Sequence, residues 1–369
     1  MRYLSPYINQ ILKKKMVFVG GPRQSGKTTL AKTFINNQDA YLNWDFDIDR
    51  ERILKNNIPL QFPLLILDEI HKYPRWRNWL KGYYDKYSPR IKFLITGSAK
   101  LDLYRRGGDS LQGRYRYLRL YPFSFKETNS NAEKIIHELM SYSGFPEPFL
   151  AKSETESRIW SREYRTRLIK EDLVDLENIQ NTAIFEKLLL LLPERVGSPL
   201  SINSLREDLS VAHDTISRWL EIYERLYGIF RIYPFQNTKL KSLKKESKHY
   251  HFDWTLVEDK GARFENLIAF HLLKHVHFLQ DTKGIDINLY YFRDIEKREI
   301  DFVIVQDKKP LAFIEAKISD TKPTTSLNYI RQKFPNARII QVLLENDLHS
   351  DYRGIEIMGA KKFLSELSV

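Results

Sequence analysis

The residues with the clearest chemical use form one continuous stretch near the start of the chain. Its glycines let successive backbone N–H groups face an anion, its lysine can reach terminal phosphates, and its threonine hydroxyl can hold Mg²⁺. The spacing therefore predicts a site for the phosphates of a nucleoside triphosphate and its Mg²⁺ ion, and a plain glycine turn is the alternative. The stretch consists of Gly21, Pro22, Arg23, Gln24, Ser25, Gly26, Lys27, Thr28 and Thr29.

Two carboxylates after a strongly apolar run could complete that chemistry. Asp68 and Glu69 directly follow residues 64–67. We expect Asp68 to support the Mg²⁺ ion and Glu69 to deprotonate an attacking water, as hydrolysis requires. Thr96 ends a later apolar run and is a candidate sensor of the terminal phosphate, or simply a strand-ending residue. Arg114 could stabilise developing charge, in its own chain or in a neighbouring subunit, and a solvated surface arginine is the alternative.

A second set of charged residues gathers in the C-terminal part of the chain. Two apolar runs flank a polar turn at 306–310, which predicts a hairpin with Asp301 roughly opposite Glu315. Alternation along the strand puts Glu315 and Lys317 on one face, and Glu265 on an upstream helix could point to the same place. Burying such charges is costly unless they bind something, and a salt-bridged surface face is the alternative.

These four residues resemble the acid and lysine set of the PD-(D/E)xK nuclease superfamily. The resemblance implies that Glu265, Asp301 and Glu315 hold one or two Mg²⁺ ions, and that Lys317 supports the nucleophilic water or the phosphate charge. It adds DNA cleavage to the candidate activities. The histidines at 271, 275 and 277 lack a partnering Glu motif, so we expect packing and surface roles rather than zinc ligation.

The elements that must position the first set alternate between strand and helix. Apolar runs at 16–19, 64–67 and 91–95 predict buried strands, while 29–34 and 76–87 have helical patterns. Buried strands that alternate with helices form parallel sheets, and ligands bind at the carboxyl ends of those strands. The first part of the chain therefore predicts an α/β P-loop NTPase domain with a parallel sheet.

The middle of the chain predicts a winged helix-turn-helix. Two short helices at 202–209 and 212–220 precede two strand-like runs at 229–235 and 250–254. The second helix would present His213, Asp214, Thr215, Ser217 and Arg218 to DNA. The loop from Lys239 to Lys248 would contact phosphates through Lys239, Lys241, Lys244, Lys245 and Lys248. An interdomain coupler and a merely solvated basic loop are the alternatives.

Composition narrows the classes of partner and location. The chain has 369 residues, no cysteine and a formal net charge of +12, which excludes disulfides and favours an anionic partner such as DNA. No segment is apolar enough to predict a membrane span, and no signal peptide is evident, so the expected location is the cytoplasm. Self-association is compatible with an arginine supplied between subunits.

Several motifs in fixed order also resemble a known family. These are Gly-Pro-Arg-Gln-Ser-Gly-Lys-Thr-Thr-Leu, Leu-Asp-Glu-Ile-His-Lys-Tyr-Pro-Arg-Trp, Leu-Ile-Thr-Gly-Ser-Ala, Leu-Gln-Gly-Arg and Tyr-Pro-Phe-Ser-Phe-Lys-Glu. They look like the AAA-type prokaryotic ATPases whose C-terminal half is a domain of unknown function, the AAA_14/DUF4143-like group. The second position of Pro-Phe-Ser-Phe is more often Leu there, a conservative departure. The resemblance spans essentially the whole chain and implies ATP as the nucleotide.

These observations predict three domains and a DNA-associated ATPase. The domains are a P-loop AAA-type ATPase at 1–145, a helical and winged-helix domain at 146–257, and an α/β PD-(D/E)xK nuclease-like domain at 258–369. The expected function is ATP binding and hydrolysis with ATP-regulated, Mg²⁺-dependent DNA processing. A non-nucleolytic ATP-dependent nucleic-acid-binding or signalling switch is the alternative, and a protein-remodelling ATPase is a further one.

Overall fold

The computed structural model describes residues 2–97, 101, 111–128, 132–169, 182–235, 246–345 and 348–369. Internal contacts divide the chain into two compact units, Met1–Pro122 and Phe123–Val369, here named unit 1 and unit 2. The division into three domains at 1–145, 146–257 and 258–369 stays a prediction. Four lysines of the predicted basic loop, at 239, 241, 244 and 245, lie outside the described residues.

Unit 1 contains a five-stranded parallel sheet with the strand order β2-β3-β4-β1-β5. Every pair of neighbours in it is parallel, as the alternation of strands and helices predicted. The carboxyl ends of all five strands therefore lie at one edge, where ligands of α/β proteins bind. The strands are β1 (Met16–Gly20), β2 (Tyr41–Asn43), β3 (Leu64–Asp68), β4 (Lys92–Thr96) and β5 (Tyr115–Arg119).

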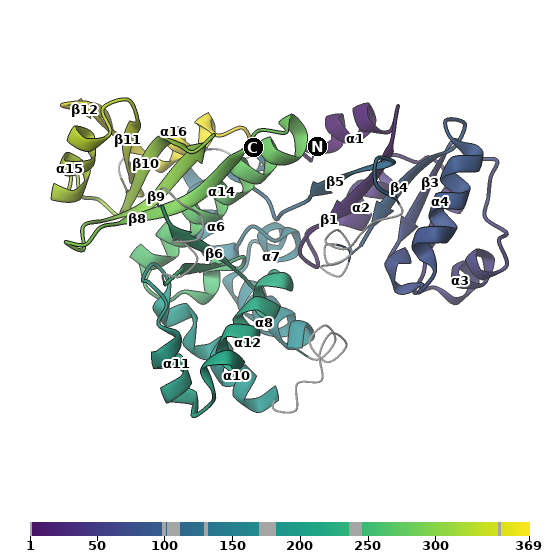
Figure 1. Ribbon diagram of the computed structural model, residues 1–369, viewed down its shortest axis with the longest axis horizontal. Coiled ribbons are helices and arrows are strands. Elements are labelled where there is room, and N and C mark those ends of the chain that lie inside the picture. Colours follow the sequence, from purple (N-terminus) through teal and green to yellow (C-terminus); the bar gives the residue numbers. More distant parts are fainter. Residues whose placement is uncertain are drawn as a thin grey trace. The chain divides into compact units, whose positions relative to one another are not determined.

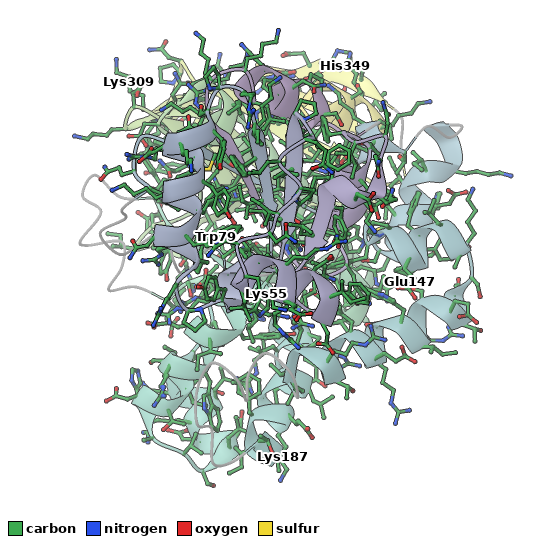
Figure 2. The ribbon with its side chains drawn as sticks, turned by 90° about the vertical axis from the view of Figure 1, so that its right-hand side faces the viewer. Lys55, Trp79, Glu147, Lys187, Lys309 and His349 are labelled. Atoms are coloured by element: carbon green, nitrogen blue, oxygen red, sulfur yellow. The ribbon has the colours of Figure 1, made fainter. Side chains whose placement is uncertain are left out.

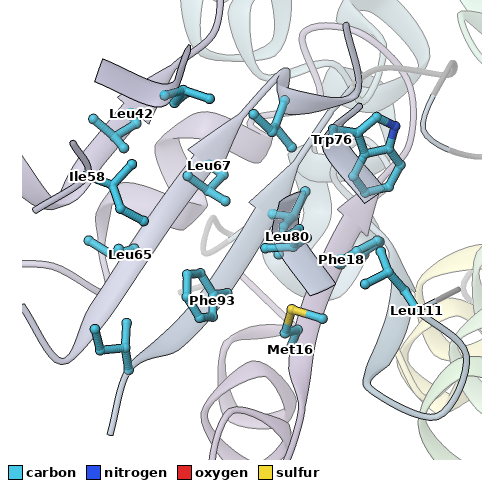
Figure 3. Close-up of a cluster of buried hydrophobic side chains, with 14 of the residues drawn as sticks. Met16, Phe18, Leu42, Ile58, Leu65, Leu67, Trp76, Leu80, Phe93 and Leu111 are labelled. Atoms are coloured by element: carbon cyan, nitrogen blue, oxygen red, sulfur yellow. The ribbon is translucent and has the colours of Figure 1, made fainter. Parts of the chain in front are cut away.

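Side chains on both faces of this sheet are buried. Phe18, Leu67 and Phe93 belong to one cluster that packs against Trp76 and Leu80 of helix α4 (Trp76–Tyr87), as Figure 3 shows. The residues that alternate with them along the strands are also buried, so both faces are covered. The other helices of unit 1 are α1 (Ser5–Ile11), α2 (Lys27–Lys32) and α3 (Asp47–Leu54), with 3₁₀ turns η1 (Gln38–Ala40) and η2 (Ile70–Lys72).

Helix α4 is amphipathic, which fixes its position on the sheet. Its apolar positions Trp76 and Leu80 are buried, and the spacing of four residues puts both on one face. The indole N–H of Trp79, labelled in Figure 2, donates to the side chain of Asn56 at 2.9 Å. This bond ties α4 to the segment that follows α3.

Unit 2 contains an eight-stranded mixed sheet with the order β12-β13-β11-β10-β9-β8-β6-β7. Val303, Phe313 and Leu327 belong to its core cluster on one face, where helix α15 packs. Helix α14 packs against β7, β8 and β10 and runs along the sheet in Figure 1. The strands are β6 (Ile229–Pro234), β7 (Lys248–His251), β8 (Ile287–Arg293), β9 (Glu299–Gln306), β10 (Lys309–Lys317), β11 (Arg338–Leu343), β12 (His349–Tyr352) and β13 (Ile355–Gly359).

The long helix α14 begins and ends at well-defined caps. The carboxylate of Asp259 accepts from the backbone N–H of Ala262, and Gly284 takes the left-handed conformation at the other end. The helices of unit 2 are α6 (Ala132–Tyr142), α7 (Pro146–Ala151), α8 (Glu154–Arg167), α10 (Thr182–Leu191), α11 (Ile202–Leu209), α12 (His213–Arg225), α14 (Lys260–Lys283), α15 (Thr325–Lys333) and α16 (Ala360–Glu366). In the part of the chain that the structure covers, no helix is both long and apolar enough to cross a membrane.

The elements expected of a winged helix occur in the expected order. Helices α10, α11 and α12 precede the antiparallel pair β6 and β7. However, β6 also pairs in parallel with β8, through Tyr233 beside Tyr290, so the hairpin belongs to the eight-stranded sheet. A wing that projects freely would have no such neighbour. The winged-helix assignment therefore stays a prediction.

Candidate functional site

The glycine-rich stretch lies between β1 and α2, at the carboxyl edge of the parallel sheet. Gly21 has φ +133°, and a Cβ built on it would lie 2.2 Å from the carbonyl oxygen of Leu120. Gly26 has φ +89° and directly precedes the first residue of α2. Both positions need glycine, one for space and both for conformation. The loop delivers Lys27 and Thr28 into the first turn of the helix, while Thr29 is exposed.

Lys27 is buried, and its ammonium donates to two backbone carbonyls of the loop. Its Nζ donates to the carbonyl oxygens of Gly21 at 3.1 Å and Pro22 at 2.5 Å. The Ser25 hydroxyl and the Gln24 side-chain oxygen are buried in the same loop without a hydrogen-bond partner among the described residues. Buried polar atoms normally have partners, so this loop fits a polar ligand such as a polyphosphate.

Asp68, the last residue of β3, accepts hydrogen bonds from three hydroxyl groups. The Thr28 hydroxyl donates to one carboxylate oxygen at 2.7 Å, and the Tyr41 hydroxyl donates to the same oxygen at 2.8 Å. Thr96, at the end of β4, donates to the other oxygen at 2.6 Å. The pair Thr28 and Asp68 offers the oxygen ligands that Mg²⁺ prefers, at the place where the P-loop begins its helix.

Glu69 follows Asp68 in the left-handed conformation, with φ 55°. Its backbone N–H donates to the carbonyl of Thr96 at 2.9 Å, which fixes the turn at the sheet edge. Burial raises the pKa of Glu69, against the opposing effect of the Lys72 ammonium. His71 Nε2 lies 3.5 Å and Lys72 Nζ 3.6 Å from one carboxylate oxygen of Glu69. A buried carboxylate with a raised pKa is suited to accept a proton.

Arg114 lies at the other edge of the sheet. Its carbonyl accepts from Met16, the first residue of β1, whereas the P-loop follows the last residue of that strand. A strand of this length spans about 16 Å. The guanidinium forms an ion pair with Asp85 of α4, with Nε 2.7 Å from Oδ1. The Arg114 backbone thus lies about a strand length from the P-loop, and its role at the phosphates, in its own chain or between subunits, stays a prediction.

Three residues near the P-loop were missed by the sequence analysis. Tyr41 and His71 contact the two carboxylates, and an Arg2 guanidinium nitrogen donates to the carbonyl of Ser25 at 2.8 Å. Tyr41 begins the strand beside β3, and His71 follows Glu69 by two residues, so proximity in the sheet was available as a signal. Arg2 had no such signal, because its contact depends on how the N-terminal segment folds back.

The acid and lysine set of unit 2 does come together. The register of β9 and β10 pairs Phe302 with Ile314, which places Asp301 opposite Glu315 as the turn predicted. Asp301 accepts from the backbone N–H of Ala316 at 3.0 Å. Glu315 accepts from Thr324, at the N-terminus of α15, at 2.7 Å, and Lys317 Nζ lies 2.9 Å from Glu315. Burial raises the pKa of Glu315.

Glu265 reaches the same cluster from α14. Its carboxylate accepts from the Tyr250 hydroxyl at 2.7 Å. Burial, together with the nearby charge of Asp301, raises the pKa of Glu265. Gly197 covers it closely, since a Cβ built there would lie 2.8 Å from a carboxylate oxygen. Glu265 is therefore a carboxylate enclosed by the fold rather than one on a solvated face.

Lys248 corrects the prediction for the basic loop. It was expected to contact phosphates from a solvated loop, but it begins β7 and its side chain is 0% exposed. Its Nζ lies 2.7 Å from Glu299, 3.5 Å from Glu265 and 3.5 Å from Asp301. Burial lowers the pKa of Lys248, but the three carboxylates more than offset this, so the pKa is raised. The surrounding acids, not solvent, stabilise this ammonium.

The acids do not fit a metal ion as they are arranged here. Glu265 and Asp301 face Lys248, while Glu315 faces Lys317 and Thr324. Across the residues with described positions, no group of three or more histidine or acidic side chains is placed to hold a metal ion.

A parallel sheet, a glycine loop before a helix and an acid pair at the same edge define a P-loop nucleotide-binding domain. Residues 13–129 match the family model described as AAA domain. Residues 133–259 match a domain of unknown function, DUF8612, and residues 260–363 match another, DUF4143. These matches support an AAA-type ATPase group and an ATPase-like P-loop domain in unit 1.

The relatives of the whole chain are uncharacterized proteins. One from Methanocaldococcus jannaschii is 23% identical over 380 residues, covering 93% of this chain and 84% of the relative. One from Haemophilus influenzae is 22% identical over 400 residues, covering 95% and 96%. Among solved structures, the Bacillus subtilis DNA clamp loader delta protein has a TM-score of 0.29 and 11% identity, covering 60% of this chain and 88% of that chain.

Proposed function

We propose that unit 1 binds ATP with Mg²⁺ and hydrolyses it. The observation that carries this proposal is the carboxylate of Asp68, which joins the P-loop through Thr28 and the neighbouring strand through Thr96. Hydrolysis needs a metal-supporting acid next to a proton acceptor, and Glu69 follows Asp68 directly. The match to the AAA domain model supports the same class.

Each residue has a distinct role in this proposal. When bound, Mg²⁺-ATP supplies the γ-phosphoryl group, with the metal neutralising its charge. Lys27 and the backbone N–H groups of the loop hold the phosphates, and Thr28 with Asp68 holds the metal. Glu69 accepts the proton of the attacking water. Thr96 keeps the Asp68 carboxylate oriented from β4.

The test is Mg²⁺-dependent phosphate release by the full chain, with ATP and GTP compared. Thr28→Ala removes the proposed metal ligand and should lower release by about 10²-fold or more. Thr33→Ala is the matched control, because its hydroxyl donates only to the nearby carbonyl of Leu30, at 2.7 Å, and it should leave release unchanged. Release that does not require Mg²⁺, or that survives Thr28→Ala, would contradict the proposal.

For unit 2 we propose nucleic-acid binding without cleavage. The support for binding is local, because the exposed residues His213, Asp214 and Arg218 lie on the helix that would face DNA. The burial of Lys248 among the acids argues against the metal-dependent nuclease that the resemblance implied. The non-nucleolytic switch is thus the better-supported form of the function expected from sequence.

Binding and cleavage are tested separately. Anisotropy of labelled DNA at several salt concentrations should show Arg218→Ala lowering the salt slope by about 0.9 if Arg218 contacts a phosphate. Arg225→Ala, in the last turn of the same helix and 3.8 Å from Glu221, is the matched control. Cleavage of plasmid with Mg²⁺ or Mn²⁺ that is lost in Asp301→Ala and Lys317→Ala would restore the nuclease and contradict this form of the function.

A further inference from the structure

We propose that Lys248 is a resident cation of unit 2, which occupies the place between Glu265, Glu299 and Asp301 that a divalent metal ion would otherwise take. The proposal rests on the proposed absence of cleavage in unit 2 and gives that absence a physical cause. It makes a separate prediction about metal binding, which is measured without nucleic acid or ATP.

The first support is the geometry of the ammonium. Its nitrogen lies within 3.5 Å of an oxygen from each of three carboxylates, which come from α14 and β9. The Tyr250 hydroxyl donates to the same Glu265 oxygen that faces Lys248. The ammonium is therefore a positive charge surrounded by carboxylate and hydroxyl oxygens, as a hard metal ion would be. It differs from a metal ion in that it binds these oxygens by donating hydrogen bonds.

The second support is that the main chain fixes Lys248 in place. Its backbone pairs with Ile232 in the β6–β7 ladder on one side. On the other side it forms a bridge with Pro199, next to Leu200, whose N–H donates to the carbonyl of Ser247 at 2.8 Å. The Nζ also lies 5.6 Å from the centre of the Tyr291 ring. The strand therefore holds the main chain of Lys248 beside the cluster, and its side chain, 0% exposed, has no solvent-facing alternative position close by.

The third support is charge. Three carboxylates around an enclosed point repel one another and need a cation. Lys317 contributes less, because it pairs with Glu315, its side chain is 36% exposed, and it acts on Asp301 and Glu265 only through a weaker charge interaction. Arg293 reaches only the outer oxygen of Glu299, at 3.6 Å. Lys248 is thus the cation that the three acids share.

Lys248→Met removes the ammonium and keeps most of the side-chain volume. The expected result is a metal-responsive protein: Mn²⁺ alone should raise the melting temperature of nucleotide-free Lys248→Met by about 5 °C or more, and leave wild type within about 1 °C. Direct titration should show Mn²⁺ binding at least about tenfold tighter in the variant. Adding Asp301→Asn to Lys248→Met should abolish both responses.

Lys274→Met is the matched control. Lys274, on α14, is also buried and forms an ion pair with Glu127, away from Glu265, Glu299 and Asp301. Its removal should destabilise the protein without creating a response to Mn²⁺. A response in Lys274→Met as large as in Lys248→Met would overturn the proposal, because it would show general repair of a buried acid. A folded Lys248→Met protein that ignores Mn²⁺ would overturn it too.

If Lys248→Met yields no folded protein, the proposal can still be tested on the wild-type protein. The proposal requires that nucleotide-free wild type bind no Mn²⁺ that depends on unit 2. Titration of wild type beside Glu299→Gln should therefore give identical curves. Mn²⁺ binding by wild type that Glu299→Gln removes would overturn the resident cation and favour a true metal site.

Discussion

The two units each enclose a lysine at strand ends lined with carboxylates, yet the partners of the two lysines differ. In unit 1 the ammonium of Lys27 donates to the backbone carbonyls of Gly21 and Pro22. In unit 2 the ammonium of Lys248 lies among the carboxylates of Glu265, Glu299 and Asp301. The first cation donates to two backbone carbonyls and acts on Glu69 through its charge, while the second lies within 3.5 Å of three carboxylates.

This difference decides which lysine can do chemistry. A bond between an ammonium and a carbonyl is exchanged readily for one to a phosphate, because the phosphate brings charge that the carbonyl lacks. A buried ammonium among carboxylates gains nothing from such an exchange, and leaving would uncover several unpaired charges. Lys27 is therefore available for ligand binding, and Lys248 serves the structure.

Removal of Lys27 should give the largest effect on function. Lys27→Ala should lower ATP hydrolysis by about 10³-fold or more, because the ammonium is the charge placed to stabilise the transferring phosphoryl group. Phosphate release under saturating ATP measures this. Lys55→Ala is the control, since Lys55, labelled in Figure 2, is exposed and pairs with Glu51 by an i,i+4 contact. Equal rates of ATP hydrolysis in Lys27→Ala and Lys55→Ala would contradict a role for Lys27 in ligand binding.

Glu69→Gln should separate binding from hydrolysis. The amide keeps the shape of the side chain but cannot accept a proton, so we expect hydrolysis to fall by about 10²- to 10³-fold while ATP still binds. Equilibrium binding of a fluorescent ATP analogue and phosphate release, measured on one preparation, give both numbers. Glu51→Gln, an exposed acid in the same unit, is the control. Loss of ATP binding in Glu69→Gln would assign Glu69 to holding the ligand instead.

Within unit 2, the two lysines of the cluster should differ in stability. Lys248→Met leaves three carboxylates without their shared cation and should lower the free energy of unfolding by about 3–5 kcal/mol in metal-free buffer. Lys317 is partly exposed and contacts one carboxylate, so Lys317→Ala should cost below about 1 kcal/mol. Urea unfolding measures both. An equal loss of unfolding free energy in the two variants would mean that Lys248 stabilises these acids no more than Lys317 does.

The raised pKa of Glu69 gives a pH test of the site in unit 1. Below its pKa the carboxyl is protonated and cannot act as a base, so kcat should fall at low pH, with the midpoint above the ordinary value of 4.5. Lys72 opposes this rise in pKa, so Lys72→Met should move the midpoint upward by about half a pH unit or more. Lys55→Met should leave the midpoint in place. A downward shift in Lys72→Met would contradict Glu69 as the titrating base.

The features that the sequence predicted correctly are those set by residues close together in the chain or by the register of one hairpin. The P-loop is one continuous stretch, and the position of Asp301 opposite Glu315 follows from where a turn is centred. Lys248 was assigned wrongly because it follows four lysines and its acidic partners are 17 to 53 positions away, as Glu265 and Asp301 show. A sequence alone cannot tell whether a lysine beside other lysines faces water or distant acids.

Substitution of Arg114 should have the smallest effect on ATP hydrolysis, because Arg114 and the P-loop lie at opposite ends of the strands. It was a candidate because it follows the predicted strand at 91–95 in the sequence and an arginine can stabilise charge on a transferring phosphate. The start of β5 pairs with the start of β1, however, so Arg114 lies beside Met16 while the P-loop follows Gly20. Arg114→Ala should change hydrolysis by less than about twofold in dilute protein, and cost about 0–1 kcal/mol through its exposed pair with Asp85. If hydrolysis per protein rises with protein concentration in wild type but not in Arg114→Ala, then Arg114 acts on a neighbouring subunit. If Arg114→Ala loses hydrolysis at every protein concentration, the position of Arg114 at the edge of the sheet away from the phosphates is contradicted.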